Sequence, residues 1–291
     1  MPFVKMERHF AHSSDGCQIA YWTHGNGPHA MLLVPGLGTP PEAYHFLVQH
    51  FSPRFRCITW NLRGTFDSSP PPEGHLDIPF HVADLEAVVA AEALTQFVLG
   101  GWSLGVQIAL EYALHHQDRI QALVLINGTF GHPMRFNDPL RKALLSVTPP
   151  VLRAIDKPLQ RLIQGSFRLP WLWQQSLRFT GFVANNHDTF IDLAAIYTTQ
   201  SFRTLLDIVE AADQHTIEPF LHQIDIPALV TAGTHDWMTP PERAKRLAEQ
   251  LPQATYIEIP GGTHYTPLEY PEPINAAVES LLRPLLSDEG L

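Results

Sequence analysis

The sequence is poor in cysteine and in long hydrophobic runs. Only Cys17 and Cys57 occur among 291 residues, and both lie in strand-like surroundings, which favours two buried free thiols over a disulfide. No apolar run approaches the roughly 18 residues of a membrane-spanning helix, and residues 1–10 lack the apolar core of a signal peptide. We therefore expect a cytoplasmic protein with no transmembrane segment.

Basic residues are also scarce. The chain has 19 Lys and Arg against 29 Asp and Glu, a formal net charge of −10, and this balance argues against general nucleic-acid binding. The sequence contains no Gly-rich phosphate loop and no clustered Cys/His spacing. His115 and His116 are adjacent and so point in different directions on a helix. The sequence predicts neither a cofactor nor a metal.

What the sequence does contain is an alternation of short apolar runs and helical patterns, which predicts an α/β fold. We expect an eight-stranded, mostly parallel sheet flanked by helices, whose first two strands form an antiparallel hairpin. The expected strands are Glu7–His12, Gln18–His24, Met31–Val34, Phe55–Trp60, Gln96–Gly100, Ala122–Ile126, Ala228–Ala232 and Thr255–Ile259. The expected helices are Glu42–His50, Phe80–Ala93, Leu104–His115, Pro241–Leu251 and Pro273–Leu285.

One interval breaks this alternation. About 100 residues separate the sixth and seventh expected strands, far more than a simple crossover needs. The interval is rich in proline and aromatic residues and then becomes helical over 188–210. We expect residues 133–213 to form an inserted helical cap, and residues 1–132 and 214–291 to form the core domain.

The first part of this cap is basic, with eight Lys and Arg and two acidic residues over 133–178. One interpretation is that cations and apolar groups meet an anionic amphiphile or a membrane surface. The other is that the cations pair with later acids of the cap, namely Asp188, Asp192, Asp207, Glu210 and Asp213. Trp171 and Trp173 likewise either line an apolar substrate pocket or only anchor the cap to the core.

The stretch Gly101–Gly105, Gly-Trp-Ser-Leu-Gly, lies between an apolar run and an apolar helical pattern. In this context G-x-S-x-G is typical of a nucleophile elbow. Serine on so tight a turn has a strained backbone, and small residues two positions to either side let strand and helix approach. The hydroxyl is then exposed at a helix N-terminus, where N–H groups stabilise an oxyanion. We expect Ser103 to be a nucleophile.

A serine nucleophile needs a base, and the base needs an acid that orients it. Asp236 follows the seventh expected strand and His264 follows the eighth, in a Gly-rich loop. The chain order is then Ser–Asp–His, and both partners lie at the strand ends where ligands bind in such sheets. We expect Asp236 as the acid and His264 as the base.

Other candidates for these two roles are disfavoured by position. His235 adjoins the acid itself, Asp225 precedes its strand and Glu242 lies on a helix. Some proteins of this architecture carry the acid after the preceding strand, but Asn127-Gly128 occupies that place and supplies no carboxylate.

An oxyanion hole needs two N–H donors. Leu104, directly after the nucleophile, supplies one, and Leu37 in the loop after the third expected strand is the best candidate for the other. Gly36 lets this loop approach the reacting carbonyl, and we expect Gly36 and Trp102 to contact substrate together with the two cap tryptophans.

Together these segments resemble the α/β-hydrolase superfamily over nearly the whole chain outside the cap. Residues 35–38 look like its oxyanion turn, 101–105 are similar to its nucleophile elbow, and Asp236 and His264 fall where its acid and base lie. Residues 61–68 look like its Asp-x-Arg-Gly-x-Gly-x-Ser turn, except that Asn61 replaces the acid and Phe66 a glycine. These departures put the shape of that turn in doubt.

The resemblance implies a capped serine hydrolase of the esterase, lipase or lactonase kind, acting on an ester, lactone or thioester of a small hydrophobic molecule. Serine at the elbow argues against the relatives that use an aspartate nucleophile, such as haloalkane dehalogenases. Perhydrolysis, carbon–carbon hydrolysis and acyl transfer use the same triad and stay open. A ligand-binding receptor with negligible turnover is the alternative outside enzymes, and the oligomeric state is not predicted.

Overall fold

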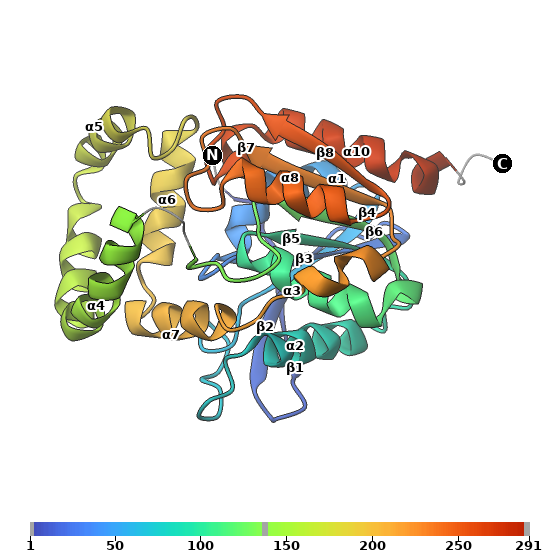
Figure 1. Ribbon diagram of the computed structural model, residues 1–291, viewed down its shortest axis with the longest axis horizontal. Coiled ribbons are helices and arrows are strands. Elements are labelled where there is room, and N and C mark those ends of the chain that lie inside the picture. The colour runs from blue at the N-terminus through green and yellow to red at the C-terminus, as the bar shows by residue number, and fades with distance from the viewer. Residues whose placement is uncertain (1–2, 136–138, 288–291) are drawn as a thin grey trace.

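A single twisted sheet organises the computed structural model (Figure 1). The structure describes residues 3–135 and 139–287, with side chains described for 3–135 and 148–286. The strand order is β1-β2-β4-β3-β5-β6-β7-β8. β1 pairs antiparallel with β2 and β2 with β4, and all the other pairs are parallel. The strands are β1 Glu7–His12, β2 Gln18–His24, β3 His29–Val34, β4 Phe55–Trp60, β5 Phe97–Trp102, β6 Ile120–Ile126, β7 Ala228–Gly233 and β8 Ala254–Ile259.

Helices cover both faces of this sheet, because its central strands are apolar on both sides. β5 and β7 are buried over their whole length. α2, α3 and α8 pack against one face, and α1 and α10 against the other. The helices outside the interval between β6 and β7 are α1 His45–Phe51, α2 Ile78–Ala91, α3 Leu104–His115, α8 Pro241–Gln250, α9 Thr266–Glu269 and α10 Pro271–Ser287. Short 3-10 helices span Pro41–Tyr44, Gln117–Arg119 and Glu218–Gln223.

The predicted sheet is confirmed, including its antiparallel start, and each of the eight expected strands is present within a few residues. The predicted helix over 42–50 differs in detail. It begins as the 3-10 turn Pro41–Tyr44, with proline in its first turn, and continues as α1. Cys17 and Cys57 are buried free thiols, as expected.

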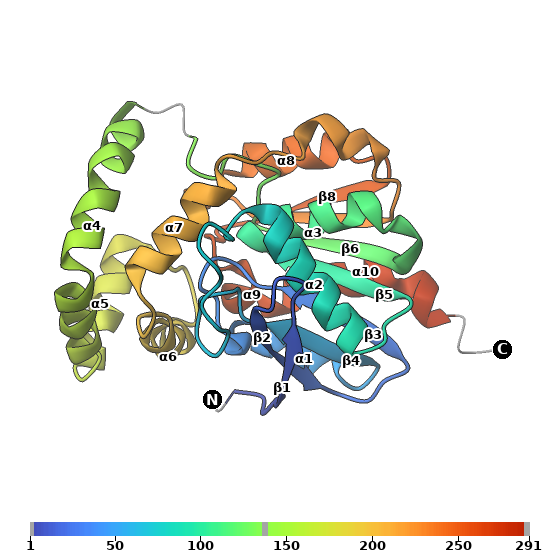
Figure 2. The ribbon, with the colours of Figure 1, turned by 90° about the horizontal axis from the view of Figure 1, so that it is seen from below.

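Within the described residues, four α-helices lie between β6 and β7 and stand to one side of the sheet (Figures 1 and 2). They are α4 Pro139–Ser166, α5 Pro170–Thr180, α6 His187–Tyr197 and α7 Phe202–Ala212. The single helical stretch expected over 188–210 is wrong in one respect, because it is broken between α6 and α7. Thr198 and Thr199 turn their hydroxyls back onto carbonyls three residues earlier, and Ser201 accepts a hydrogen bond from the Thr204 N–H as the cap of a new helix.

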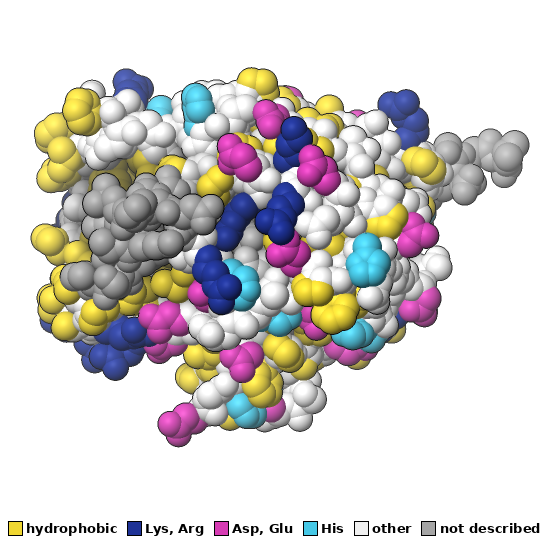
Figure 3. Space-filling view, in the orientation of Figure 1, with side chains coloured by type: hydrophobic (Ala, Val, Ile, Leu, Met, Phe, Trp, Pro, Cys, Tyr) yellow, Lys and Arg dark blue, Asp and Glu magenta, His cyan; other side chains and the backbone are white. Residues whose placement is uncertain are grey.

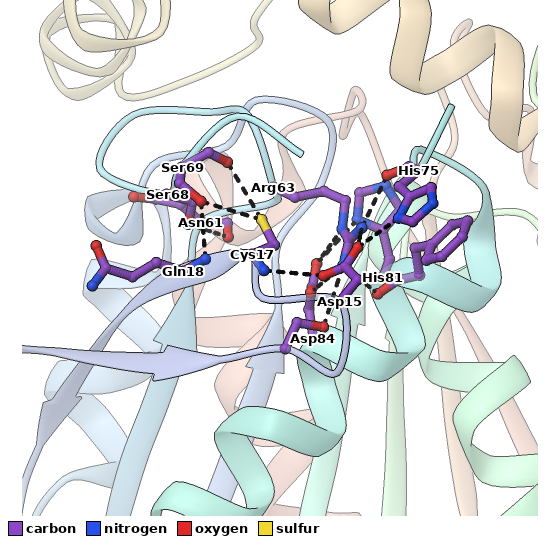
Figure 4. Close-up of polar contacts among 12 residues, drawn as sticks. Asp15, Cys17, Gln18, Asn61, Arg63, Ser68, Ser69, His75, His81 and Asp84 are labelled. Atoms are coloured by element: carbon purple, nitrogen blue, oxygen red, sulfur yellow. Dashed lines mark hydrogen bonds and ion pairs between the residues drawn. The ribbon is translucent and has the colours of Figure 1, made fainter. Parts of the chain in front are cut away.

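A buried cation fixes the loop after β4 (Figure 4). Arg63 is fully buried, and its guanidinium donates two hydrogen bonds to Asp84, at 2.6 and 2.8 Å, and one to Asp15 at 2.8 Å. Asp15 also bonds His75 Nδ1 at 2.8 Å. We call these four residues the Arg63 cluster. It ties the β1–β2 turn, this loop and α2 together.

Hydrogen bonds hold the turn at 61–68, which contains the two unusual residues. Phe66 adopts a left-handed backbone with φ 44°, the conformation for which a glycine is the ordinary choice. Asn61 is buried, and its carbonyl accepts a hydrogen bond from the Ser68 hydroxyl at 2.9 Å. Ser68 Oγ in turn accepts from the Ala20 N–H at 3.0 Å, so the turn is anchored to β2.

Candidate functional site

Ser103 lies on the turn between β5 and α3 with a strained backbone, φ 58° and ψ −120°. The glycines beside it are required by space. A Cβ at Gly101 would lie 2.4 Å from the Gly105 carbonyl oxygen, and a Cβ at Gly105 would lie 2.3 Å from the Val34 carbonyl oxygen. A left-handed conformation costs an ordinary residue about 1–3 kcal/mol and persists only where the surroundings hold it. The turn thus presents the hydroxyl away from the sheet.

Three side chains from separate loops form one hydrogen-bonded chain. His264 Nε2 lies 2.9 Å from Ser103 Oγ, and His264 Nδ1 lies 2.8 Å from Asp236 Oδ2. His264 and Asp236 are buried, whereas Ser103 is half-buried. We call these residues the Ser–His–Asp chain. With Nδ1 protonated and donating to the carboxylate, Nε2 is left as the acceptor for the serine proton.

Both carboxylate oxygens of Asp236 accept hydrogen bonds. Its Oδ1 accepts from the backbone N–H groups of Met238 and Thr239 at 2.9 and 2.8 Å. Its Oδ2 accepts from the Thr239 hydroxyl at 2.7 Å and from Asn127 Nδ2 at 2.9 Å. Burial alone would raise the pKa of Asp236, but His264 and these donors outweigh it and hold the pKa below its ordinary value. The carboxylate is therefore ionised at neutral pH.

Asn127 is a site residue that sequence reasoning passed over. It was set aside because it supplies no carboxylate, yet its carboxamide donates to Asp236 and to the Thr263 carbonyl at 3.0 Å. Its Oδ1 accepts from the Thr266 hydroxyl. The signal available in the sequence was its place directly after β6, at the same sheet edge as the other site loops.

The rival residues lie elsewhere. His235, Asp225 and Glu242 are all exposed. The His235 N–H donates to the Gly262 carbonyl at 2.8 Å, and Asp225 accepts from Gln253 Nε2 at 2.8 Å. None of the three lines the cavity described below.

The loops that carry the two expected N–H donors both border the serine. Leu104 is the first residue of α3, where backbone N–H groups have no partner within the helix. Gly36 closely approaches the elbow, since a Cβ there would lie 3.2 Å from Ser103 Cβ and 3.1 Å from the Trp102 carbonyl oxygen. Leu37 follows it and lines the cavity.

A cavity of about 150 Å³ opens on the serine. Its walls come from the loop 37–43, from the site loops and from one face of α6. Among the described residues that line it none carries a formal charge, apart from His264 if protonated. They are Leu37, Thr39, Pro40, Ala43, Trp102, Ser103, Phe190, Leu193, Ala194, Tyr197, Met238, His264, Tyr265 and Leu268.

The structure brings one of the expected tryptophans to this cavity. Trp102 lines it and donates from Nε1 to the His264 carbonyl at 3.0 Å. Trp171 is 61% exposed, and Trp173 stacks on Phe167 and donates to the Ser166 hydroxyl at 3.0 Å. Neither is among the described residues that line the cavity. Among the aromatic side chains that α6 contributes to the cavity lining is Phe190, which the sequence pattern does not single out.

A buried carboxylate connects the cavity to the segment between α5 and α6. Glu269 accepts the backbone N–H of Ala184 at 2.6 Å on Oε1. The same carboxylate accepts the Thr263 hydroxyl and backbone N–H, both at 2.7 Å. Thr263 directly precedes His264, so one side chain joins this segment to the loop that carries the histidine.

The outer side of α4 and α5 is apolar and basic. Figure 3 shows hydrophobic side chains gathered along the left margin, where these helices lie in Figure 1. Large exposed apolar residues here are Val151, Ile155, Leu162, Leu169, Trp171, Leu172 and Phe179. Arg153 pairs with Asp207 and Glu210, as one interpretation expected. The exposed cations Lys157, Arg161, Arg168 and Arg178 form no ion pair with a described residue. No described helix is both long enough and apolar enough to cross a bilayer.

The chain is similar to known hydrolases along its length. A family model described as the alpha/beta hydrolase fold matches residues 29–271. A Caulobacter sp. (strain K31) protein named as the carbamate hydrolase RutD is 29% identical over 87% of this chain and 90% of its own. A pimeloyl-[acyl-carrier protein] methyl ester esterase from Nitrosomonas europaea is 25% identical over 89% and 97%. The crystal structure of an enol-lactonase from Burkholderia xenovorans LB400 superposes with a TM-score of 0.75 at 21% identity, covering 94% and 100%.

Proposed function

Because the chain belongs to the alpha/beta hydrolase fold family, we propose that it is a serine hydrolase that cleaves carboxylic esters through an acyl-enzyme. The observation that carries this proposal is the Ser–His–Asp chain, which ends at a strained serine lining an apolar cavity. A hydroxyl, a base and an orienting acid in this order are what acyl transfer requires.

In the proposed mechanism Ser103 Oγ attacks the ester carbonyl while His264 Nε2 takes its proton. Asp236 holds the imidazole in the required tautomer and stabilises the imidazolium that forms. The N–H groups of Leu37 and Leu104 bind the oxyanion of the tetrahedral intermediate. His264 then protonates the leaving alcohol, and a water that it deprotonates releases the acid and frees the serine.

The cavity favours a neutral and small acyl group. A dry apolar cavity of about 150 Å³ accommodates roughly one benzene ring, and the volume here is about 150 Å³. Burying a carboxylate without a charged partner costs several kcal/mol, and none of the described lining residues offers a cation other than a protonated His264. We therefore assign short-chain or monocyclic acyl esters to the site, together with lactones and thioesters of that size.

Residues 133–213 serve as the cap in this proposal. α6 supplies one wall of the cavity through Phe190, Leu193, Ala194 and Tyr197, which share one helix face. Gln200 donates from Nε2 to the Gly38 carbonyl at 2.8 Å and ties the cap to the loop that carries the Leu37 N–H. Residues 1–132 and 214–291 form the catalytic core.

The outer side of α4 and α5 contacts a membrane surface in this proposal. Large apolar side chains beside four exposed cations complement the acyl boundary and the headgroups of an anionic bilayer. Such a leaflet faces the cytoplasm. The reducing conditions there are consistent with Cys17 and Cys57 being free thiols.

Co-sedimentation with vesicles tests this contact. The protein should bind phosphatidylglycerol vesicles more tightly than phosphatidylcholine vesicles, and Arg161→Glu should weaken binding at least about fivefold, since one basic residue contributes about 1 kcal/mol. Lys245→Glu, on the exposed side of α8 in the core, is the matched control. Equal binding to both lipids, no binding, or self-association that Arg161→Glu abolishes would refute the membrane contact.

Intact-mass spectrometry after exposure to a fluorophosphonate probe tests the enzyme. We expect one stoichiometric adduct, absent in Ser103→Ala. An ester series from acetyl to decanoyl should then show rates that fall steeply beyond about six or seven acyl carbons. Adding an aryl carbamate, hydrogen peroxide or an alcohol acceptor to the assay distinguishes carbamate cleavage, perhydrolysis and acyl transfer. Tight ligand binding with no adduct on folded protein would favour the receptor alternative.

A further inference from the structure

Two tyrosines line the cavity, one from α6 and one from the loop after β8. Tyr197 comes from the last turn of α6 and packs against the loop 35–39. The packing is close, since a Cβ built on Gly38 would lie 2.9 Å from Tyr197 Cε2. Tyr265 comes from the loop after β8. Its ring packs edge-on against Trp102 at 6.1 Å and against Phe190 at 4.8 Å between centroids. Both line the cavity.

Neither phenol hydroxyl forms a hydrogen bond with a described residue, although other tyrosines of the core do. Tyr44, for example, donates to the Val34 carbonyl at 2.6 Å, and Tyr112 donates to Glu86 at 2.7 Å. Burial raises the pKa of Tyr197 to about 12, and burial together with the neighbouring Tyr197 raises the pKa of Tyr265 further. Both phenols therefore stay protonated and can donate.

A hydroxyl in an apolar cavity has two kinds of partner, water or a ligand. When a purely hydrocarbon group displaces the water, the hydroxyl loses its hydrogen bond, and this loss opposes binding. When the group carries an oxygen at the right place, the bond is replaced. Two such hydroxyls in one cavity, whose other lining is mostly apolar, select for a polar atom inside the substrate.

We infer that Tyr197 and Tyr265 form a subsite that donates hydrogen bonds to an uncharged oxygen within the acyl group, such as an ether, hydroxyl or oxo oxygen. The inference rests on the proposed ester hydrolysis for its location next to Ser103. It narrows the substrate from any small hydrophobic ester to an oxygen-bearing one. Both tyrosines are specificity residues here and take no part in the bond-making steps.

Isosteric ester pairs test the subsite. p-Nitrophenyl methoxyacetate and p-nitrophenyl butyrate differ by one ether oxygen in place of a methylene, as do the 3-methoxypropionate and valerate esters. Each kcat/KM is divided by the rate of hydroxide-catalysed hydrolysis, which removes intrinsic reactivity. We expect the wild-type protein to prefer the oxygen-bearing member of at least one pair about tenfold. Tyr197→Phe or Tyr265→Phe should reduce that preference about fivefold to tenfold, the value of one hydrogen bond.

Two controls separate this inference from the proposed function. Tyr256→Phe removes a phenol hydroxyl on β8 that contacts the Pro241 carbonyl and Glu258, outside the cavity lining, and should leave the preference unchanged. Fluorophosphonate labelling of Ser103 in the wild type and in both cavity variants reports separately whether the serine is activated. Normal labelling with no preference, or with a preference that neither variant alters, would overturn the subsite alone.

If the protein hydrolyses none of these esters, ligand binding still tests whether the subsite prefers an oxygen-bearing group. Saturation-transfer NMR on Ser103→Ala with ethyl methoxyacetate and ethyl butyrate measures the same preference without catalysis. We expect the ether to bind more tightly and the two cavity substitutions to equalise the pair. Equal binding to the Ser103→Ala protein would refute the subsite.

Discussion

The Arg63 cluster and the Ser–His–Asp chain each have a buried, charged centre and a partly exposed end, and they differ in what that end contacts. The Arg63 guanidinium donates to two carboxylates, the Ser13 hydroxyl and two backbone carbonyls. The cluster ends at His75, which is partly exposed and stacks on the Phe80 ring. Asp236 is equally well satisfied, but the chain that it begins ends at a half-buried serine beside a cavity. Buried charge and a partly exposed end are common to both, so the cavity beside Ser103 is what indicates chemistry.

The largest expected effect is on turnover. Ser103→Ala should lower kcat by on the order of 10⁶ because the serine, histidine and acid act as a unit. The thermal midpoint should stay nearly unchanged, since the lost hydroxyl is at the open end. Steady-state kinetics and calorimetry on the same samples check both. More than about a tenth of the activity remaining in Ser103→Ala would remove the distinction between the two clusters.

Asp236→Asn should lower kcat by about 10⁴, because the amide no longer fixes the tautomer of His264. It should also lower stability, since Asp236 accepts from four donors besides His264. Asp225→Asn, an exposed carboxylate, is the control and should change neither quantity. Equal kinetics for the two variants would show that Asp236 is structural, like the acids around Arg63.

Arg63→Met should lower the free energy of unfolding and leave turnover nearly unchanged. Removing one partner of a buried ion pair leaves uncompensated charge on Asp84 and costs about 3–5 kcal/mol in the free energy of unfolding. Denaturant unfolding measures it, and kcat per folded molecule should stay within about twofold of wild type. Arg8→Met is the control. Its pair with Asp67 is exposed and should contribute at most about 1 kcal/mol.

The smallest effect expected concerns pH. His81 is buried on α2, with Nδ1 3.9 Å from Asp84 Oδ2, and burial lowers its pKa from 6.5 to about 4. Between these values the unfolded chain binds a proton that the folded chain does not, so the free energy of unfolding falls as pH drops. The loss is on the order of 3 kcal/mol. His81→Leu should flatten this part of a melting curve series from pH 7 to pH 4. An unchanged slope would contradict it.

The sequence was informative where local pattern and topology suffice. Short apolar runs are enough to locate the strands, because a sheet covered on both faces needs them. Asp236 and His264 could be selected because strand ends meet at one edge. The structure places His264 within hydrogen-bond distance of both Asp236 and Ser103.

Contacts between residues far apart in the chain could not be predicted from local sequence patterns. Which face of α6 meets the cavity depends on how this helix packs on the core, so the local sequence does not identify Phe190 and Tyr197 as lining residues. Trp171 and Trp173 are conspicuous in the sequence, but they are not among the described residues that line the cavity. Asn127 was missed for a different reason. Its function is to donate, and a search for a carboxylate excludes a donor.

Glu269 favours the closed position of the proposed cap. If the segment at Ala184 lifts away, Oε1 loses a donor in a buried place, and leaving a buried polar group short of partners costs about 1–3 kcal/mol. That cost makes open molecules about 5 to 150 times rarer than they would be without the contact. Because the same carboxylate holds Thr263 beside the histidine, a molecule with a closed cap is also one whose base is held in place.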